Sequence, residues 1–322
     1  MGLAAGLKQF LITKASDCVV TDLAHDAVVI DSMCFLHNFA YSGGNLVDQL
    51  VEYFYDLVRR EKTFALCFDH FATSPSEKRE EWSRRAQPSR VISREQFIDL
   101  INANQLTEEV FNIVMCTRDV RDVLNSVIAL GLSRRIDPEQ KMYLIGCDDV
   151  PALVTHDRWT PRPDLMTHGE GDLACVYAAH VLRNETGASR VRIRTIDTDL
   201  LAIGLLHSFQ GLYIHTHFRD KHDVFDMHVL ARIIVTDMQM SVDAFVALCV
   251  LRGTDFSSAT IRGIADWNVY MLALRGARES DVQSLSRRIL SYAPKRAKLH
   301  PSADFRKSQW VMQYWRNTIK ST

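Results

Sequence analysis

Residues 27–69, AVVIDSMCFLHNFAYSGGNLVDQLVEYFYDLVRREKTFALCFD, carry the pattern from which the architecture of the chain follows. The run from Val28 to Ile30 is short and β-branched, which predicts a buried strand. Residues 45–60 place apolar side chains at helical spacing, and residues 63–68 predict a second strand. A strand, a helix and a strand in this order form a βαβ unit, which implies a parallel sheet with a right-handed crossover.

The same alternation continues along the chain. Strands are expected at 142–145, 191–196 and 212–217, and helices at 94–132, 172–182, 200–206, 229–235 and 242–251. Residues 150–167 contain three prolines and little periodicity, so we expect a loop there. The pattern predicts an α/β fold with a central, mostly parallel sheet flanked by helices. In such sheets, active sites form at the carboxyl ends of the strands.

Acidic residues follow several of the expected strands and helices. They are Asp31, Asp69, Glu170, Asp172, Asp197, Asp199 and Asp255. A single strand-end Asp often only caps the next helix. So many carboxylates at one edge would repel each other unless cations neutralised them. Carboxylate oxygens suit Mg²⁺ or Mn²⁺, and two such ions are the usual device for cleaving a phosphodiester.

The composition sets limits on the function. The chain has 322 residues and a formal net charge of −1, which is unusual for a nucleic-acid binder. The cations, however, gather at 78–94, 183–194 and 287–320. Seven cysteines without a C-x-x-C pair indicate reduced thiols, and the histidines at 207–228 fit no zinc spacing. Without a membrane-length apolar run or a signal-peptide core, we expect an intracellular protein, nuclear if its source is a eukaryotic cell, with no membrane partner.

Six sequence blocks occur in the order found in one family of nucleases. They are MGLAAGL (1–7), VIDS (29–32), CFD (67–69), GEGDLA (169–174), IDTDLL (196–201) and FVALCVLRGTDF (245–256). Together they resemble the flap endonuclease, or XPG-type, family of 5′-nucleases, whose core is PIN-like. The resemblance implies a core at 1–256 that includes a basic helical arch at about 74–132. It also implies a degenerate helix-hairpin-helix and a basic helical region at 257–322.

The resemblance also implies roles for individual residues. Asp31, Asp69, Glu170 and Asp172 would hold one metal ion, and Asp172, Asp197, Asp199 and Asp255 the second. Lys78 would act as a catalytic cation that shields the phosphate charge. The residues implied in nucleic-acid binding are Lys78, Arg79, Arg84, Arg85 and His37, the last of which stands near the family's base-stacking Tyr. The implied cofactors are two Mg²⁺ or Mn²⁺ ions.

The sequence departs from the family pattern at several places. Asp172 replaces a Glu, and the segment 132–168 is longer than usual. Ala265-Asp266 stands where the hairpin of the family has Gly-Pro or Gly-Val, and an Asp there repels phosphate. Gln309, Met312 and Trp315 faintly resemble a sliding-clamp peptide, although an amphipathic terminal helix fits the same residues.

The expected function is a structure-specific 5′-nuclease that cleaves DNA at flaps or 5′ ends, with implied roles in DNA replication and repair. An RNA-cleaving 5′-nuclease is the alternative, because residues 169–172 also resemble exoribonucleases and residues 195–201 resemble herpesvirus host-shutoff RNases. A non-catalytic nucleic-acid-binding scaffold is the alternative from another class. Duplex binding is expected to depend on the cations between 287 and 307.

Overall fold

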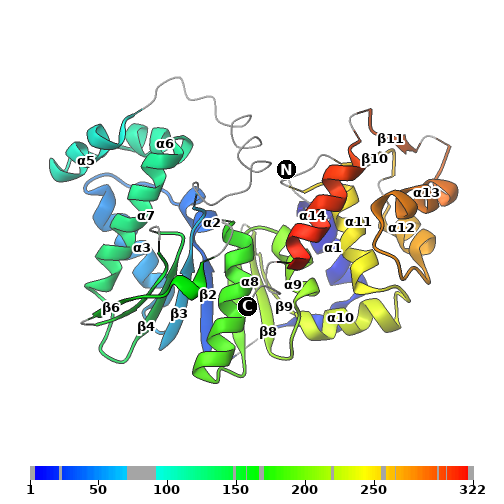
Figure 1. Cartoon of the computed structure of the whole chain (residues 1–322), viewed down its shortest axis with the longest axis horizontal. Coiled ribbons are helices and arrows are strands. Elements are labelled where there is room, and N and C mark those ends of the chain that lie inside the picture. The colour runs from blue at the N-terminus through cyan, green and yellow to red at the C-terminus, as the bar shows by residue number, and fades with distance from the viewer. Residues whose placement is uncertain are drawn as a thin grey trace. The chain divides into compact units, whose positions relative to one another are not determined.

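The protein forms two compact units in the computed structural model (Figure 1). Unit 1 comprises Met1–Ala24 and Thr195–Thr322, and unit 2 comprises His25–Arg194. The structure describes residues 4–21, 24–70, 92–147, 150–156, 158–166, 170–218, 221–254, 259–264, 266–295, 297–301 and 303–317. The division into domains at residue 256 stays a prediction.

Unit 2 contains a mostly parallel sheet. Its strands are β2 (Ala27–Asp31), β3 (Thr63–Cys67), β4 (Lys141–Ile145), β5 (Ala152–Thr155), β6 (Arg158–Pro161) and β7 (Val191–Thr195). They lie in the order β7-β2-β3-β4-β5-β6. The pairs β7–β2, β2–β3 and β3–β4 are parallel, and β5 and β6 are antiparallel additions. The α/β fold predicted from the sequence is confirmed.

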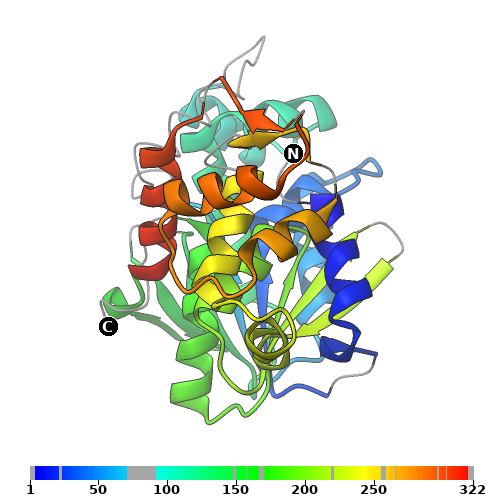
Figure 2. The same ribbon diagram turned by 90° about the vertical axis from the view of Figure 1, so that its right-hand side faces the viewer.

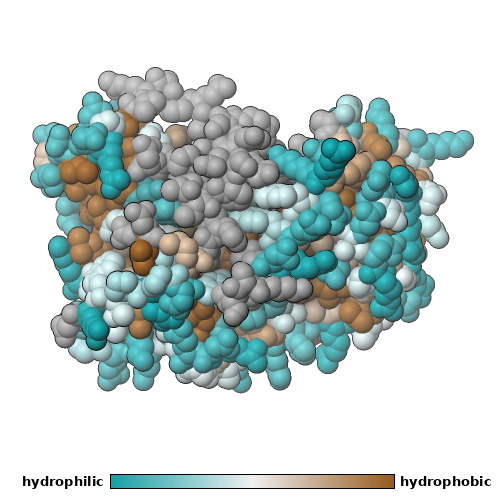
Figure 3. All heavy atoms as spheres, in the orientation of Figure 1, coloured by the Kyte–Doolittle hydropathy of each residue, from teal (hydrophilic) through white to brown (hydrophobic). Residues whose placement is uncertain are grey.

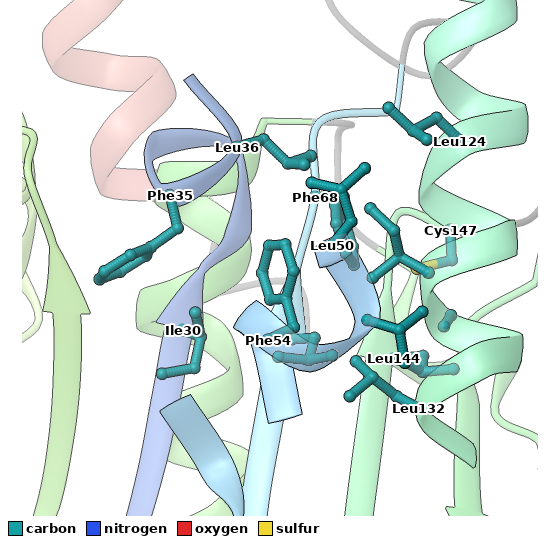
Figure 4. Packing of buried hydrophobic residues seen from close by; sticks show 14 of the residues in the cluster. Ile30, Phe35, Leu36, Leu50, Phe54, Phe68, Leu124, Leu132, Leu144 and Cys147 are labelled. Carbon is teal, nitrogen blue, oxygen red and sulfur yellow. The ribbon is translucent and has the colours of Figure 1, made fainter. Parts of the chain in front are cut away.

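Helices cover both faces of this sheet. They are α2 (Ser32–His37), α3 (Leu46–Val58), α5 (Arg94–Asn102), α6 (Glu108–Cys116), α7 (Arg118–Ser133) and α8 (Gly171–Thr186), with a 3₁₀ turn at Pro163–Leu165. Ile30, Phe54 and Leu144 belong to the core that α3 and α7 form with one face (Figure 4). Cys67 hydrogen-bonds to Cys175 of α8. Successive residues of a strand point to opposite faces of the sheet, so Cys67 and Leu66 point to different faces. Helix α8 therefore covers the face opposite the core that contains Leu66.

Two expected elements of unit 2 were wrong in detail. The helix expected at 94–132 is three helices, because Ser93 caps α5 with a capping box and Thr107 caps α6. Thr117 has extended backbone angles and separates α6 from α7. The loop expected at 150–167 contains the β5–β6 hairpin. Its prolines stand at or just outside the strand ends, where a missing N–H is tolerated.

Unit 1 is mainly helical. Its helices are α1 (Ala4–Lys14), α9 (Asp199–Leu206), α10 (Met227–Thr236), α11 (Val242–Arg252), α12 (Trp267–Leu274), α13 (Val282–Tyr292) and α14 (Phe305–Asn317), with a 3₁₀ turn at Ser16–Cys18. Its strands are β1 (Val19–Val20), β8 (Leu212–Phe218), β9 (Lys221–Asp226), β10 (Ile261–Arg262) and β11 (Lys298–Leu299). β1, β9 and β8 pair antiparallel in that order, and β10 pairs with β11.

Helix α11 is the centre of unit 1. All its residues from Ala244 to Leu251 are buried, and it packs against α9, α13 and α14 (Figure 2). A helix that is apolar all round is stable only inside a core, which accounts for the residues FVALCVL at 245–251. Among the described residues, no helix is both long and apolar enough to span a bilayer.

Candidate active site

Two acidic residues of unit 2 stand at the carboxyl ends of neighbouring strands. Asp31 is the last residue of β2, and its register partner on β3 is Cys67, two residues before Asp69. Asp31 is only 2% exposed, and its Oδ1 accepts a long hydrogen bond from the Cys34 N–H at 3.4 Å. The carboxylate therefore caps α2 as well as ending the strand. The sequence pattern alone predicted this edge for both acids.

The acidic block at residues 170–172 contacts Asp69 directly. The Gly171 N–H, at the first residue of α8, donates a 2.7 Å hydrogen bond to Asp69 Oδ1. Glu170 and Asp172 flank this glycine, and Glu170 is 1% exposed. A Cβ on Gly171 would lie 2.9 Å from Asp69 Oδ1, closer than real Cβ contacts allow. A side chain at position 171 would therefore force the Asp69 carboxylate to shift.

The buried thiol of Cys175 lies near two carboxylates of this edge, those of Asp31 and Asp172. Burial raises the pKa of Cys175 well above its usual range, and its hydrogen bond to Cys67 and the charges of Asp31 and Asp172 act in the same direction. Both carboxylates are thus near one thiol of α8. In unit 2, Asp31, Asp69 and the acids at the start of α8 lie along one edge of the sheet.

Replacing Gly171 with alanine is expected to lower any activity that depends on this acidic edge while leaving the fold intact. The new methyl group displaces the Asp69 carboxylate by a few tenths of an ångström or more, and small misplacements at a reacting centre cost up to about a hundredfold in rate. Alanine is the better helix former, so the melting temperature should not fall. Cleavage kinetics with thermal melting measure both effects. A variant as active as the wild type would show that the Asp69–Gly171 contact does not organise the site.

A buried cation that sequence reasoning missed lies near this edge. Arg121, in the first turns of α7, is 7% exposed, and its Nη1 donates to Met115 O at 3.4 Å. The atoms packed around the His37 side chain disfavour its charged form and lower its pKa. The Arg121 charge lowers this pKa further, whereas the Asp69 charge raises it. Arg121 and Asp69 are therefore both close enough to His37 to act on its charge.

The orientation of α7 explains why Arg121 reaches this edge. Ser126 Oγ donates to the carbonyl of Cys147, just beyond the end of β4. Arg121 lies five residues nearer the helix N-terminus, which is about 7.5 Å along the axis. Asn125 shares its face and is fully buried, and within the described chain neither end of its amide has a hydrogen-bond partner. Two polar residues spaced four apart on an otherwise apolar helix face were the signal in the sequence.

Two further acids lie in unit 1. Asp197 Oδ1 accepts a 2.8 Å hydrogen bond from the N–H of Asp199, which is the first residue of α9 and 1% exposed. Burial raises the pKa of Cys249, and the Asp199 charge acts in the same direction, so Asp199 lies near α11. Directly after α11, Gly253 has a φ of +103°, a backbone conformation that favours glycine.

Several predicted site residues lie outside the described residues: Lys78, Arg79, Arg84, Arg85 and Asp255. Among the residues that the structure does describe, no three His, Cys, Asp or Glu side chains are close enough together to hold a metal ion. The donors present are carboxylates, the type that Mg²⁺ and Mn²⁺ prefer, and the Gly171 N–H fixes the orientation of Asp69. The two-ion site and the gathering of seven acids stay predictions.

No family model matches the chain, and no curated protein matches it either. The solved catalytic core of Rad2 in complex with DNA substrate matches at 14% identity over 88% of this chain and 68% of that chain, with a TM-score of 0.41. The bacteriophage T5 D15 flap endonuclease, in a pseudo-enzyme-product complex with DNA and metal ions, matches at 12% identity, 91% and 88% coverage and a TM-score of 0.38.

The chain is similar in structure to these two solved proteins, and the second of them is a flap endonuclease. The six sequence blocks between residues 1 and 256 predicted the same likeness.

The helix-hairpin-helix expected after β10 has a changed turn. Asp266 Oδ1 accepts a 2.8 Å hydrogen bond from the Asn268 N–H and caps α12. The ring of Trp267 stacks on Phe10 at 5.1 Å, and the Arg252 guanidinium lies 5.0 Å from the Trp267 ring centre. A carboxylate thus occupies the helix N-terminus, where a phosphate could otherwise bind. At this departure from the family pattern, the Asp266 carboxylate therefore caps α12.

The clamp-like residues of α14 are used inside unit 1. Gln309 Oε1 accepts a hydrogen bond from the Val282 N–H at the start of α13. Met312 is 1% exposed and Trp315 is fully buried. These side chains stabilise the C-terminal helices, as expected for an amphipathic terminal helix, and a sliding clamp could reach them only if α14 detached.

Proposed function

We propose that this protein is a divalent-metal-dependent nuclease, and that it acts on DNA as a structure-specific 5′-nuclease. The observation that carries the proposal is the hydrogen bond from the Gly171 N–H to Asp69 Oδ1. It joins an acid at the end of one strand to the acidic start of α8, beside the strand that ends in Asp31. Acids from three separate segments at one sheet edge are typical of a cation site for phosphate chemistry.

Each group has a proposed role in the reaction. Asp31, Asp69, Glu170 and Asp172 would hold one divalent ion, and Asp172, Asp197, Asp199 and Asp255 a second. Bound ions of this kind supply a nucleophile at neutral pH and neutralise charge on the phosphate. Lys78, with Arg79, Arg84 and Arg85, would shield the scissile phosphate, and His37 would stack on a base.

A second candidate is an RNA-cleaving nuclease of the same chemistry. The capped turn at Asp266 favours it, because a structure-specific DNA nuclease needs a firm hold on duplex, and the carboxylate repels phosphate there. A single-stranded RNA substrate would not need that turn. Both candidates share the same acidic edge.

The decisive experiment is a panel of end-labelled substrates. A 5′-flap, a nicked duplex, single-stranded DNA and single-stranded RNA are incubated with the full chain in Mg²⁺, in Mn²⁺ and in EDTA. Preferred cleavage of the flap supports the first candidate, and preferred cleavage of RNA supports the second. If no substrate is cut in either metal, and calorimetry shows no Mn²⁺ binding, the nuclease proposal fails and a scaffold remains.

Replacing Arg121 with alanine is expected to slow cleavage by about a hundredfold, because a fixed cation beside the acidic edge stabilises the charged phosphate. Arg121→Lys keeps the charge and should recover part of the rate. Arg135→Ala is the matched control, since Arg135 follows the other end of α7 and pairs with Glu52. If Arg121→Ala cleaves as fast as the wild type, Arg121 has only a structural role, in which it joins α7 to α6.

A further inference from the structure

A small antiparallel ribbon of unit 1 presents cations to solvent. It consists of β10 and β11, in which Ile261 pairs with Leu299 and Arg262 pairs with Lys298. Ile261 is 4% exposed, so this side chain packs inward, whereas Arg262 and Lys298 are both exposed. Figure 1 labels the strands at the upper right, and Figure 3 shows hydrophilic side chains extending outward from that part of the surface. We call this pair of strands the basic ribbon.

Two like charges directly opposite each other in a ribbon are unfavourable. Their side chains share one face, with Cβ atoms about 5 Å apart. The flanking segments 257–265 and 282–303 contain no Asp or Glu, and within the described residues neither Arg262 nor Lys298 has an acidic partner. Lys295, in the turn before β11, is a third exposed cation. This arrangement costs stability in the free protein and is relieved by an anion.

The basic ribbon is held firmly at both ends. The Thr260 N–H donates to Leu251 O at 2.8 Å, and the His300 N–H donates to Thr260 O at 2.8 Å. Arg252 Nη1 donates to Ile264 O at 2.9 Å, with its guanidinium over Trp267. Both ends of the segment 260–264 are therefore fastened to Leu251 and Arg252 in the last turn of α11. A fixed cationic surface loses little entropy when it binds an anion.

One neighbouring cation, Arg288, has a structural role. Arg288 Nε donates to Ala273 O at 2.6 Å, and its Nη2 donates to Arg275 O, so this side chain closes the end of α12. Of the cations between 287 and 307 from which duplex binding is expected, Lys298 stands on the ribbon directly opposite Arg262. Resting on the nucleic-acid substrate of the proposed function, we propose that the basic ribbon binds the sugar-phosphate backbone of that substrate through Arg262 and Lys298.

The test is equilibrium binding of labelled duplex and single-stranded oligonucleotides to the full chain in EDTA, where no cleavage occurs, over a range of salt concentrations. Arg262→Ala with Lys298→Ala should weaken binding by about tenfold and reduce the log–log salt slope for duplex by about 1.8, which is two phosphates at 0.9 each. Lys14→Ala with Arg232→Ala is the matched control, because both residues are exposed cations of unit 1. Its slope should equal that of the wild type.

A second variant separates binding from folding. Arg262→Glu creates an opposite-charge pair with Lys298, so its melting temperature should equal or exceed that of the wild type while its affinity falls. A ribbon variant with wild-type affinity and slope overturns the proposal, and so does a control variant that loses as much. Ribbon-dependent binding without any cleavage would overturn only the nuclease function. Cleavage with ribbon-independent binding would overturn only the ribbon.

Discussion

Asp197→Asn is expected to abolish cleavage and to leave the fold of unit 1 unchanged. The asparagine Oδ1 can still accept the hydrogen bond from the Asp199 N–H, so the turn before α9 is kept. Only the negative charge is lost, and in the proposed site this carboxylate would hold a catalytic ion. The expected loss is on the order of a thousandfold, or about 4 kcal/mol of activation free energy.

Asp226→Asn is the matched control for this experiment. Asp226 also lies in unit 1, is half-buried and accepts backbone hydrogen bonds from His228 and Val229 at 3.0 Å. The Asp226→Asn variant should therefore cleave at the wild-type rate. Single-turnover cleavage in Mg²⁺ and thermal melting are measured for both variants. Asp197→Asn cleaving at the wild-type rate would remove Asp197 from the proposed metal site.

Trp315→Ala is expected to destabilise unit 1 by about 3–5 kcal/mol, because it empties a large volume in a packed core. Trp315 is fully buried on α14, whose neighbours are α9, α11 and α13. The His207 Nε2–H also donates to the Trp315 carbonyl at 2.6 Å. Denaturant unfolding measures the free-energy change directly.

Trp310→Ala provides the comparison on the same helix. Trp310 is half-buried and stacks on Tyr314 at 4.9 Å, so its replacement should cost far less stability. The same reasoning predicts that truncation after Tyr292 unfolds unit 1 and does not merely remove a binding tail. Equal stabilities for Trp315→Ala and Trp310→Ala would show that α14 is not part of the core.

Much of the fold was predictable because hydrophobic periodicity dominates it. The β-branched run at Val28–Ile30 predicts a buried strand, and the apolar stripe of α3 predicts an amphipathic helix. Strand β6 has mostly exposed residues, so no apolar pattern predicted it. The breaks in the long helix expected at 94–132 depend on which Ser and Thr side chains cap the backbone, and Thr107 before Glu108 was a signal that periodicity concealed.

The candidate site was predictable only in part. Strand ends placed Asp31 and Asp69 at one edge, since the carboxyl ends of parallel strands always meet. The contact between Asp69 and Gly171 depends on how α8 docks on the sheet, which no local pattern encodes. The burial of Arg121 is likewise a tertiary effect, because a cation in a helix usually faces solvent. The changed residues at 265–266 were visible, but the capping role of Asp266 was not.

The Asp69–Gly171 hydrogen bond joins residues that are 102 positions apart in the chain. Closing so long a loop is entropically costly and slow compared with forming the helices and the β2–β3 pair. During refolding, helical signal should therefore return before this contact forms. Under mild denaturation, the docking of α8 can be lost while most secondary structure persists. Catalytic competence would then report on a long-range step of assembly, and a preparation with full circular dichroism could still be inactive.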